Sequence, residues 1–116
     1  MLTSMNTALS ALGAYLKKQD VTANNIANVN TTDFKKSRAE FEETSQGGVT
    51  VTISRIETPG NPLPPDEVIG GDHQMSNVGL EEELVDLITT QYGFEANTKT
   101  LQTQEELQGT LLDILA

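Results

Sequence analysis

Two long stripes of apolar residues, one at each end of the chain, constrain the fold more than any other feature. In the first stripe, residues recur at alternating steps of three and four, which is the spacing of one face of an α-helix. We therefore predict a helix over residues 2–29. The stripe consists of Leu2, Met5, Leu9, Leu12, Leu16, Gln19, Ala23 and Ile26, and is apolar except at Gln19.

The second stripe predicts a helix over residues 80–115. Gly79 is a candidate N-cap, and Glu81–Glu83 fill the first turn, where the helix dipole favours anions. Gly93 and Gly109 are unfavourable inside a helix, but they allow another backbone to approach closely. The stripe contains Leu80, Leu84, Leu87, Ile88, Gln91, Phe94, Thr98, Leu101, Glu105, Gln108, Leu112 and Leu115, and is widened by Leu107, Leu111 and Ile114.

Such stripes have two interpretations. An amphipathic helix commonly buries its apolar face within its own chain. The same face can also pack against another subunit, and the polar residues in the second stripe, such as Gln91, suit a contact that fixes register and partner. Ala8, Ala11 and Tyr15 beside the first stripe would allow both kinds of contact.

The middle of the chain changes period. Alternating residues predict a β-hairpin with strands at about 38–46 and 49–57 around Gly47-Gly48, followed by a linker over 58–79 that holds all four prolines. The fold class that we predict is mostly α with a small β-hairpin, with long terminal helices that pair as a coiled coil. The boundaries are 1–36, 37–79 and 80–116, within a single domain.

Composition excludes several classes of protein. With 17 acidic and 7 basic side chains the net charge is −10, which disfavours binding to nucleic acid or to anionic membranes. There is no cysteine, and no run approaches the roughly 20 apolar residues of a membrane span. Aromatic residues make up 4%, so the chain has little material for a core of its own.

Between the first helix and the hairpin lies an asparagine-rich stretch, residues 23–36. Asparagine is a poor helix-interior residue and a good turn residue, so we expect the helix to end near Asn30. The stretch resembles the N-terminal signature of the bacterial flagellar axial proteins. The matching residues are Asn25, Ile26, Ala27, Asn28, Asn30, Thr31, Thr32, Phe34 and Lys35. Asp33 stands where many members have glycine, and it tolerates a left-handed conformation better than most residues.

The second helix resembles the C-terminal signature of the same family, including the tetrad Phe94-Glu95-Ala96-Asn97. Further matching residues are Asn77, Val78, Glu83, Val85, Ile88, Gln91, Tyr92 and Lys99. The small middle region is similar to that of proximal-rod proteins rather than of distal-rod or hook proteins.

The resemblance implies a structural subunit of the flagellar basal-body rod, which assembles with copies of itself and with other rod proteins. The basal-body ring and export gate are further candidate partners. The resemblance also implies export through the flagellar apparatus without a cleaved signal peptide. Without the resemblance, the lack of a recognisable signal peptide would predict a cytoplasmic protein. The predicted subunit contacts are Leu2, Met5, Leu9, Leu12, Leu16, Asn25, Ile26, Asn28, Asn30, Phe34, Leu84, Ile88, Gln91, Phe94, Asn97, Leu101 and Leu112.

The charges of the two ends are opposed. Residues 1–38 carry five basic and two acidic side chains, and residues 80–116 carry one and eight. This favours antiparallel or staggered pairing of the terminal helices, within one chain or between neighbours.

Two other functions were weighed. An enzyme is disfavoured because the one histidine, His73, lies beside Asp72 in a loop without a nucleophile or base partner. We predict no cofactor, metal or small-molecule substrate. A cytosolic helical adaptor or export chaperone could use the same stripes to hold one partner, but it would not need the asparagine-rich signature.

Overall fold

The computed structural model describes residues 2–67 and 70–116. The elements in order are α1 (Leu2–Ala27), β1 (Ser37–Glu43), β2 (Val49–Arg55), the short 3₁₀ helix η1 (Pro65–Glu67) and α2 (Leu80–Leu115). The predicted fold class, mostly helical with one small hairpin, is confirmed. The predicted domain 1–116 and linker 58–79 include positions 1 and 68–69, which lie outside the described residues.

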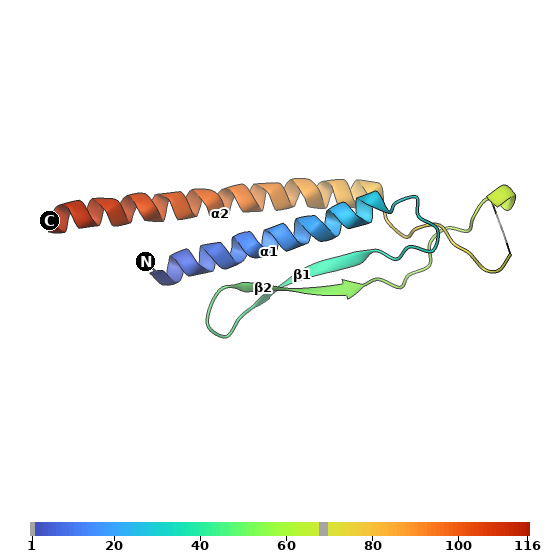
Figure 1. Ribbon diagram of the computed structural model, residues 1–116, viewed down its shortest axis with the longest axis horizontal. Helices are drawn as coiled ribbons and strands as arrows, with labels where there is room; N and C mark the ends of the chain where they lie inside the picture. The colour runs from blue at the N-terminus through green and yellow to red at the C-terminus, as the bar shows by residue number, and fades with distance from the viewer. Residues whose placement is uncertain (1, 68–69) are drawn as a thin grey trace.

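The molecule is long and thin, with extents of 75 × 26 × 14 Å. Figure 1 shows α2, α1 and the hairpin side by side, with the two helices antiparallel. Helix α1 is the central element, because it contacts α2 and also both strands. The antiparallel pairing that the charges favoured is therefore present within one chain, while coiled-coil geometry stays a prediction.

The most buried side chains of the two helices are small or polar. The buried residues of α1 are Ala8, Ala11, Ala14, Thr22 and Asn25, and those of α2 are Glu83 and Thr90. On α2, Gly93 lies against the ring of Tyr15, where an added Cβ would stand 2.5 Å from Cζ. The prediction that Gly93 makes room for a backbone is wrong, since it makes room for this ring.

The predicted stripe of α1 lies on a different face from these buried residues. Leu2, Leu9 and Leu16 are exposed, with Leu2 at 71%, and Met5 and Leu12 are half-buried. The interpretation of this stripe as a core within the chain is therefore wrong for Leu2, Leu9 and Leu16. Because the stripe is displaced by one residue from the buried alanines, spacing alone did not identify the buried face.

Both strands of the hairpin end earlier than predicted, at Glu43 and Arg55, whereas β1 begins one residue earlier than predicted. Its strands pair antiparallel from Ser37↔Arg55 to Glu43↔Val49. Thr44 belongs to the turn, where its N–H donates to the carbonyl of Gly48 and its hydroxyl donates to the carbonyl of Gly47. Both glycines have positive φ, 84° and 98°, which L side chains rarely adopt.

The linker is folded back on itself rather than simply extended. Pro62 and Gln74 form an isolated antiparallel bridge, and η1 supplies one helical turn. This turn begins at Pro65, since proline is tolerated in the first turn of a helix. Over the described ranges, no helix combines the length and apolarity needed to span a bilayer.

Candidate functional site

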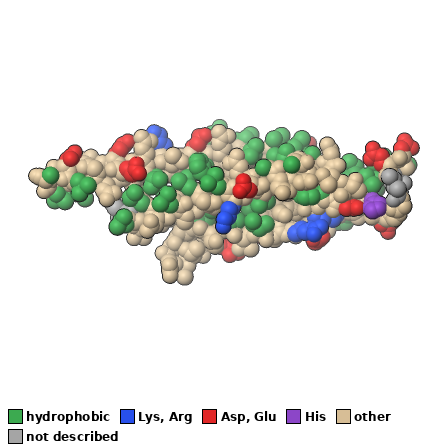
Figure 2. All heavy atoms as spheres, in the orientation of Figure 1, with side chains coloured by type: hydrophobic (Ala, Val, Ile, Leu, Met, Phe, Trp, Pro, Cys, Tyr) green, Lys and Arg blue, Asp and Glu red, His purple; other side chains and the backbone are tan. Residues whose placement is uncertain are grey.

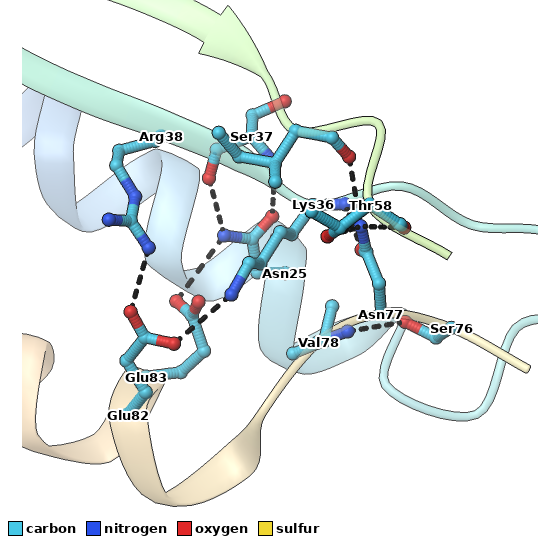
Figure 3. A network of polar contacts seen from close by, with 11 residues as sticks. Asn25, Lys36, Ser37, Arg38, Thr58, Ser76, Asn77, Val78, Glu82 and Glu83 are labelled. Atoms are coloured by element: carbon cyan, nitrogen blue, oxygen red, sulfur yellow. Dashed lines mark hydrogen bonds and ion pairs between the residues drawn. The ribbon is translucent and has the colours of Figure 1, made fainter. Parts of the chain in front are cut away.

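A network of polar side chains joins the end of α1, the start of β1 and the start of α2 (Figure 3). Its centre is Asn25, which is only 2% exposed. The Asn25 amide donates to the carbonyl of Ser37 at 2.8 Å, and the N–H of Ser37 donates back to Asn25 Oδ1 at 3.0 Å. The amide side chain thus satisfies the outer edge of β1 as a neighbouring strand would. We call the network of Asn25, Ser37, Asn77, Glu82 and Glu83 the junction.

Glu83 completes the junction from α2. Its carboxylate accepts a hydrogen bond from Asn25 Nδ2 at 3.3 Å. Burial raises the pKa of Glu83 above its usual value, and the Asn25 hydrogen bond offsets only part of that rise. Glu83 therefore has a buried structural contact in addition to the first-turn position that the sequence predicted.

The neighbouring Glu82 is exposed to solvent and forms ion pairs with two basic side chains. It pairs with Lys36 at 3.1 Å and with Arg38 at 2.7 Å. The hydrogen bond from Lys36 lowers the pKa of Glu82. The acidic start of α2 is thus neutralised by residues of β1 and the loop before it, rather than by α1.

Asn77 closes the base of the hairpin just before α2. Its Oδ1 accepts the N–H of Lys36 at 2.7 Å, and its Nδ2 donates to the carbonyls of Ile56 and Thr58. One side chain therefore holds both strands' ends together and fixes where α2 begins. The sequence named Asn77 as a signature residue but did not identify it as a site residue.

A second cluster joins the asparagine-rich stretch to the linker. Asp33 has a φ of 61°, which is the left-handed conformation. Glycine, which many flagellar axial proteins have at this position, adopts that conformation readily. The Asp33 carboxylate accepts the N–H of Gln74 at 2.9 Å and contacts His73 Nδ1 at 2.6 Å. The Gln74 N–H, then His73, lower the pKa of Asp33, and the hydrogen bond to Asp33 raises that of His73. The prediction missed this pair, which is separated by 40 residues.

The other predicted residues of the asparagine-rich stretch differ in their surroundings. Asn28 donates to the carbonyl of Asn24 and accepts from Thr31, so it closes the last turn of α1. Phe34 and Ile26 are half-buried, whereas Asn30 is exposed. Of this group, Asn25 and Asn28 are committed to contacts within the chain, and Asn30 faces solvent.

The predicted residues of α2 also divide into two groups. Phe94, Asn97 and Leu101 are half-buried, and Asn97 donates to the carbonyl of Gly93. Leu84, Ile88 and Gln91 are exposed. Val85 and Tyr92, which are equally open, were named as signature residues but not as contacts. A helical stripe of α2 pointing away from the buried face is therefore open along its first half.

Within the described residues, α2 extends past the start of α1 (Figure 1). Helix α2 has 36 residues against 26 in α1, and the difference corresponds to about 15 Å of helix at about 1.5 Å per residue. Hydrophobic side chains are visible on the surface at this end in Figure 2. We call residues 107–115 the overhang; its exposed large side chains are Leu107, Leu111, Leu112, Ile114 and Leu115.

Apolar area of this kind marks an interaction surface more often than a reaction site. Within the described ranges, no group of three metal-ligating side chains is placed to hold an ion. An open groove of about 650 Å³ lies beside α1 and β2, and the residues that line it include no nucleophile with an adjacent base. The described surface is thus suited to contacts between chains.

Comparison with known proteins agrees with this assessment. Residues 5–35 match the family described as "Flagella basal body rod protein", and residues 73–114 match "Flagellar basal body rod FlgEFG protein C-terminal". The two matched segments contain most of α1 with the asparagine-rich stretch, and nearly all of α2.

The individual relatives include flagellar rod and hook proteins. The chain is 27% identical to the flagellar basal-body rod protein FlgC of Borreliella burgdorferi, over 99% of this chain and 97% of that protein. It is 32% identical to the flagellar hook protein FlgE of the same organism over 85% of this chain, but spans only 20% of that protein. It is 32% identical to the rod protein FlgG of Caulobacter vibrioides over 66% of this chain and 29% of that protein.

The matches to hook and FlgG proteins are confined to short parts of longer chains, whereas the FlgC match covers both proteins almost completely. Both ends of the chain match rod families, and the matched segments include most of both helices and every junction residue except Ser37. The chain therefore belongs to the flagellar basal-body rod proteins.

Proposed function

We propose that the chain is a structural subunit of the proximal type that assembles, with its own copies and with other rod proteins, into the axial drive shaft that transmits torque. The observation that carries the proposal is the distribution of apolar side chains. Buried positions hold alanine, threonine, asparagine and glutamate, while leucines on α1 and the overhang remain exposed. A chain that leaves its largest aliphatic side chains in water gains stability when another chain covers them.

The two apolar surfaces lie on different elements, which determines the kind of assembly. The leucine stripe of α1 and the overhang of α2 are not the same patch, so a contact between them joins unlike surfaces of two copies. Repeated contacts between unlike surfaces give an open helical filament when the rotation does not close. A tubular rod is such a filament.

The similarity to flagellar rod proteins supports the remaining parts of the proposal. The subunit has no catalytic role, and it reaches the basal body through the flagellar export apparatus without a cleaved signal. Contacts with the basal-body ring and export gate would use the surfaces that rod neighbours leave uncovered. No observation on the structure favours the alternative of a cytosolic adaptor or chaperone.

The experiment places a charge in each apolar surface. Leu9→Asp and Leu112→Asp should each prevent assembly, because an unpaired carboxylate would be buried at the subunit contact. Asn6→Asp and Thr103→Asp are matched controls, since both positions are exposed and lie outside the leucine stripe. Assembly is measured by sedimentation of the purified chain over a range of concentrations, and by motility of cells that carry each variant.

Wild-type chain and both controls should form polymers that grow with concentration, while the two leucine variants stay small and cells become non-motile. A fixed dimer at every concentration would instead indicate the adaptor. Normal motility with Leu9→Asp and Leu112→Asp would refute assembly through these surfaces.

A further inference from the structure

The outer edge of β2 carries backbone groups without partners. The N–H and C=O of Ser37 point away from β2, toward Asn25, while the carbonyl of Lys36 accepts the N–H of Ile56. Arg55 is paired with Ser37, so its backbone N–H and C=O also point away from the other strand. Because the backbone groups of successive residues point to opposite sides of a strand, those of the odd-numbered β2 residues all point outward. Val49 uses its N–H on Ser10 Oγ. Among the described residues, the outward groups of Val51, Ile53 and Arg55 have no such partner.

This edge also lacks the features that normally prevent strand addition. Proteins protect free edges with charges, proline or a covering element. Residues 49–54 are Val-Thr-Val-Thr-Ile-Ser, with no charge and no proline, and five of the six are β-branched. Arg55, at the end of the strand, is the one charged side chain of β2. By contrast, β1 carries Arg38, Glu40, Glu42 and Glu43, and its outer edge is partly occupied by Asn25. In Figure 1 the two strands cross, and the arrowhead end of β2 lies on the side of the hairpin away from α2.

Beside this edge there is room for another chain. The groove of about 650 Å³ runs along Ile53 and Arg55 and continues over Val21, Asn24 and Phe34. Ile53 is 55% exposed although its side chain is on the same face of the hairpin as the buried Ala39, with which it is paired. An added strand would therefore find backbone partners on β2 and apolar side chains in the groove.

We propose that the β2 edge binds the β2 edge of a second copy of this chain, antiparallel, to form a four-stranded sheet. The free positions are symmetric about Ile53, so a twofold axis there pairs Ile53 with its counterpart and Val51 with the partner's Arg55. On the other face Thr52 meets Ser54. No like charges oppose one another, whereas pairing through β1 would bring glutamates of the two copies together.

This contact differs from the helix contacts of the proposed rod, and does not depend on them. It joins identical surfaces and so closes on itself as a pair. A pair formed in this way covers the exposed strand of the free subunit, which would otherwise be a site for aggregation.

The test uses the full chain with Leu9→Asp and Leu112→Asp, which removes the helix contacts. Sedimentation equilibrium should show a monomer–dimer equilibrium. Adding Ile53→Lys should weaken the dimer by at least about tenfold, because two lysines would then face each other at the axis. Adding Gln46→Lys instead should change the dissociation constant less than about twofold, since this exposed residue lies in the turn, outside the proposed contact.

Two further variants separate binding from folding. Ile53→Pro removes an N–H that points outward and leaves the β1–β2 ladder intact, so it should abolish the dimer with an unchanged circular dichroism spectrum. Since the chain has no cysteine, Ile53→Cys provides a unique thiol. Opposite residues at the axis have Cα atoms about 5.5 Å apart, within disulfide range, so mild oxidation should cross-link Ile53→Cys but not Glu40→Cys.

A chain that stays monomeric at every concentration would overturn the proposal, as would a dimer that Ile53→Lys and Ile53→Pro leave unchanged. Failure of the proposed rod function would be seen separately, as normal assembly of the Leu9→Asp and Leu112→Asp variants.

Discussion

The junction and the exposed helix surfaces have opposite chemistry. At the junction the buried side chains are polar, with Asn25 at 2% and Glu83 at 4% exposure. On the helix surfaces the exposed side chains are aliphatic, reaching 74% exposure at Leu115. Most soluble domains have the reverse arrangement, with large apolar residues inside and charged residues outside.

The difference indicates that shape and assembly depend on separate sets of residues. Hydrogen bonds of the junction are directional, so they fix where α1 ends, where β1 starts and how α2 is placed. Leucine surfaces are not directional but supply most of the free energy when covered. A subunit built in this way holds its shape with a small core and keeps its apolar area for its neighbours.

The largest effect on the free subunit should come from Asn25→Ala. This change leaves the N–H and C=O of Ser37 and the Glu83 carboxylate without a buried partner, so we expect a loss of about 2–4 kcal/mol in the free energy of unfolding. Urea denaturation followed by circular dichroism measures it. Asn30→Ala is the control, since Asn30 is exposed, and it should cost less than about 0.5 kcal/mol. Equal losses would show that the junction has no special role.

The two glycines of α2 should respond in opposite directions to alanine. Gly93→Ala places a methyl group against the Tyr15 ring, and we expect a loss of about 1–3 kcal/mol despite the better helix propensity. Gly109 has nothing within 4 Å of a built Cβ, so Gly109→Ala should gain about 0.5–1 kcal/mol. Thermal unfolding of both variants provides the comparison. Stabilisation by Gly93→Ala would contradict the close packing of α1 on α2.

Glu83→Gln should give a smaller effect that depends on pH. Folding raises the pKa of Glu83 above the ordinary glutamate value of 4.5. Its contribution to stability is therefore fully present below pH 4.5 and is lost as the pH rises through the pKa of the folded state. Glutamine keeps an acceptor for Asn25 without the charge. The variant should therefore be more stable than wild type near neutral pH, and the gain should vanish at acidic pH. A variant less stable at neutral pH would show that the ionised carboxylate is needed.

His73→Ala should have the smallest effect, and motility should be unchanged. The pKa of His73 is raised and that of Asp33 is lowered, so the pair stabilises most between their ordinary values of 3.8 and 6.5. The histidine contribution is lost as pH rises through its folded value. The unfolding midpoint of the variant should fall slightly below wild type at mildly acidic pH and match it at alkaline pH. A motility defect would reopen a functional role for this loop.

Several features could be predicted because they depend on neighbours in sequence. The period of three and four residues identified both helices, and Gly47-Gly48 located the hairpin. The left-handed position was foreseen at Asp33 because few side chains tolerate it. The prediction placed the end of β1 three residues too far into the turn, because the hydrogen bonds of Thr44 belong to the turn.

The distribution of the site residues could not be predicted in the same way. Asn25 and Asn30 are chemically identical in the sequence, but one is buried at the junction and the other is exposed. Phe94 and Ile88 both lie on the second stripe, but Phe94 is half-buried whereas Ile88 is exposed. The pairing of Asp33 with His73 joins segments 40 residues apart, and no local signal marks it.

The amino-acid sequence by itself determined the helices, the hairpin and the resemblance to rod proteins, because periodicity, turn chemistry and signature residues are properties of short segments. Only the tertiary structure decided which face of each helix is covered. Small side chains let other elements pack closely on α1, and the residues buried there are alanine, threonine and asparagine rather than leucine. That choice depends on how two distant helices fit together, and it leaves the leucines for other subunits.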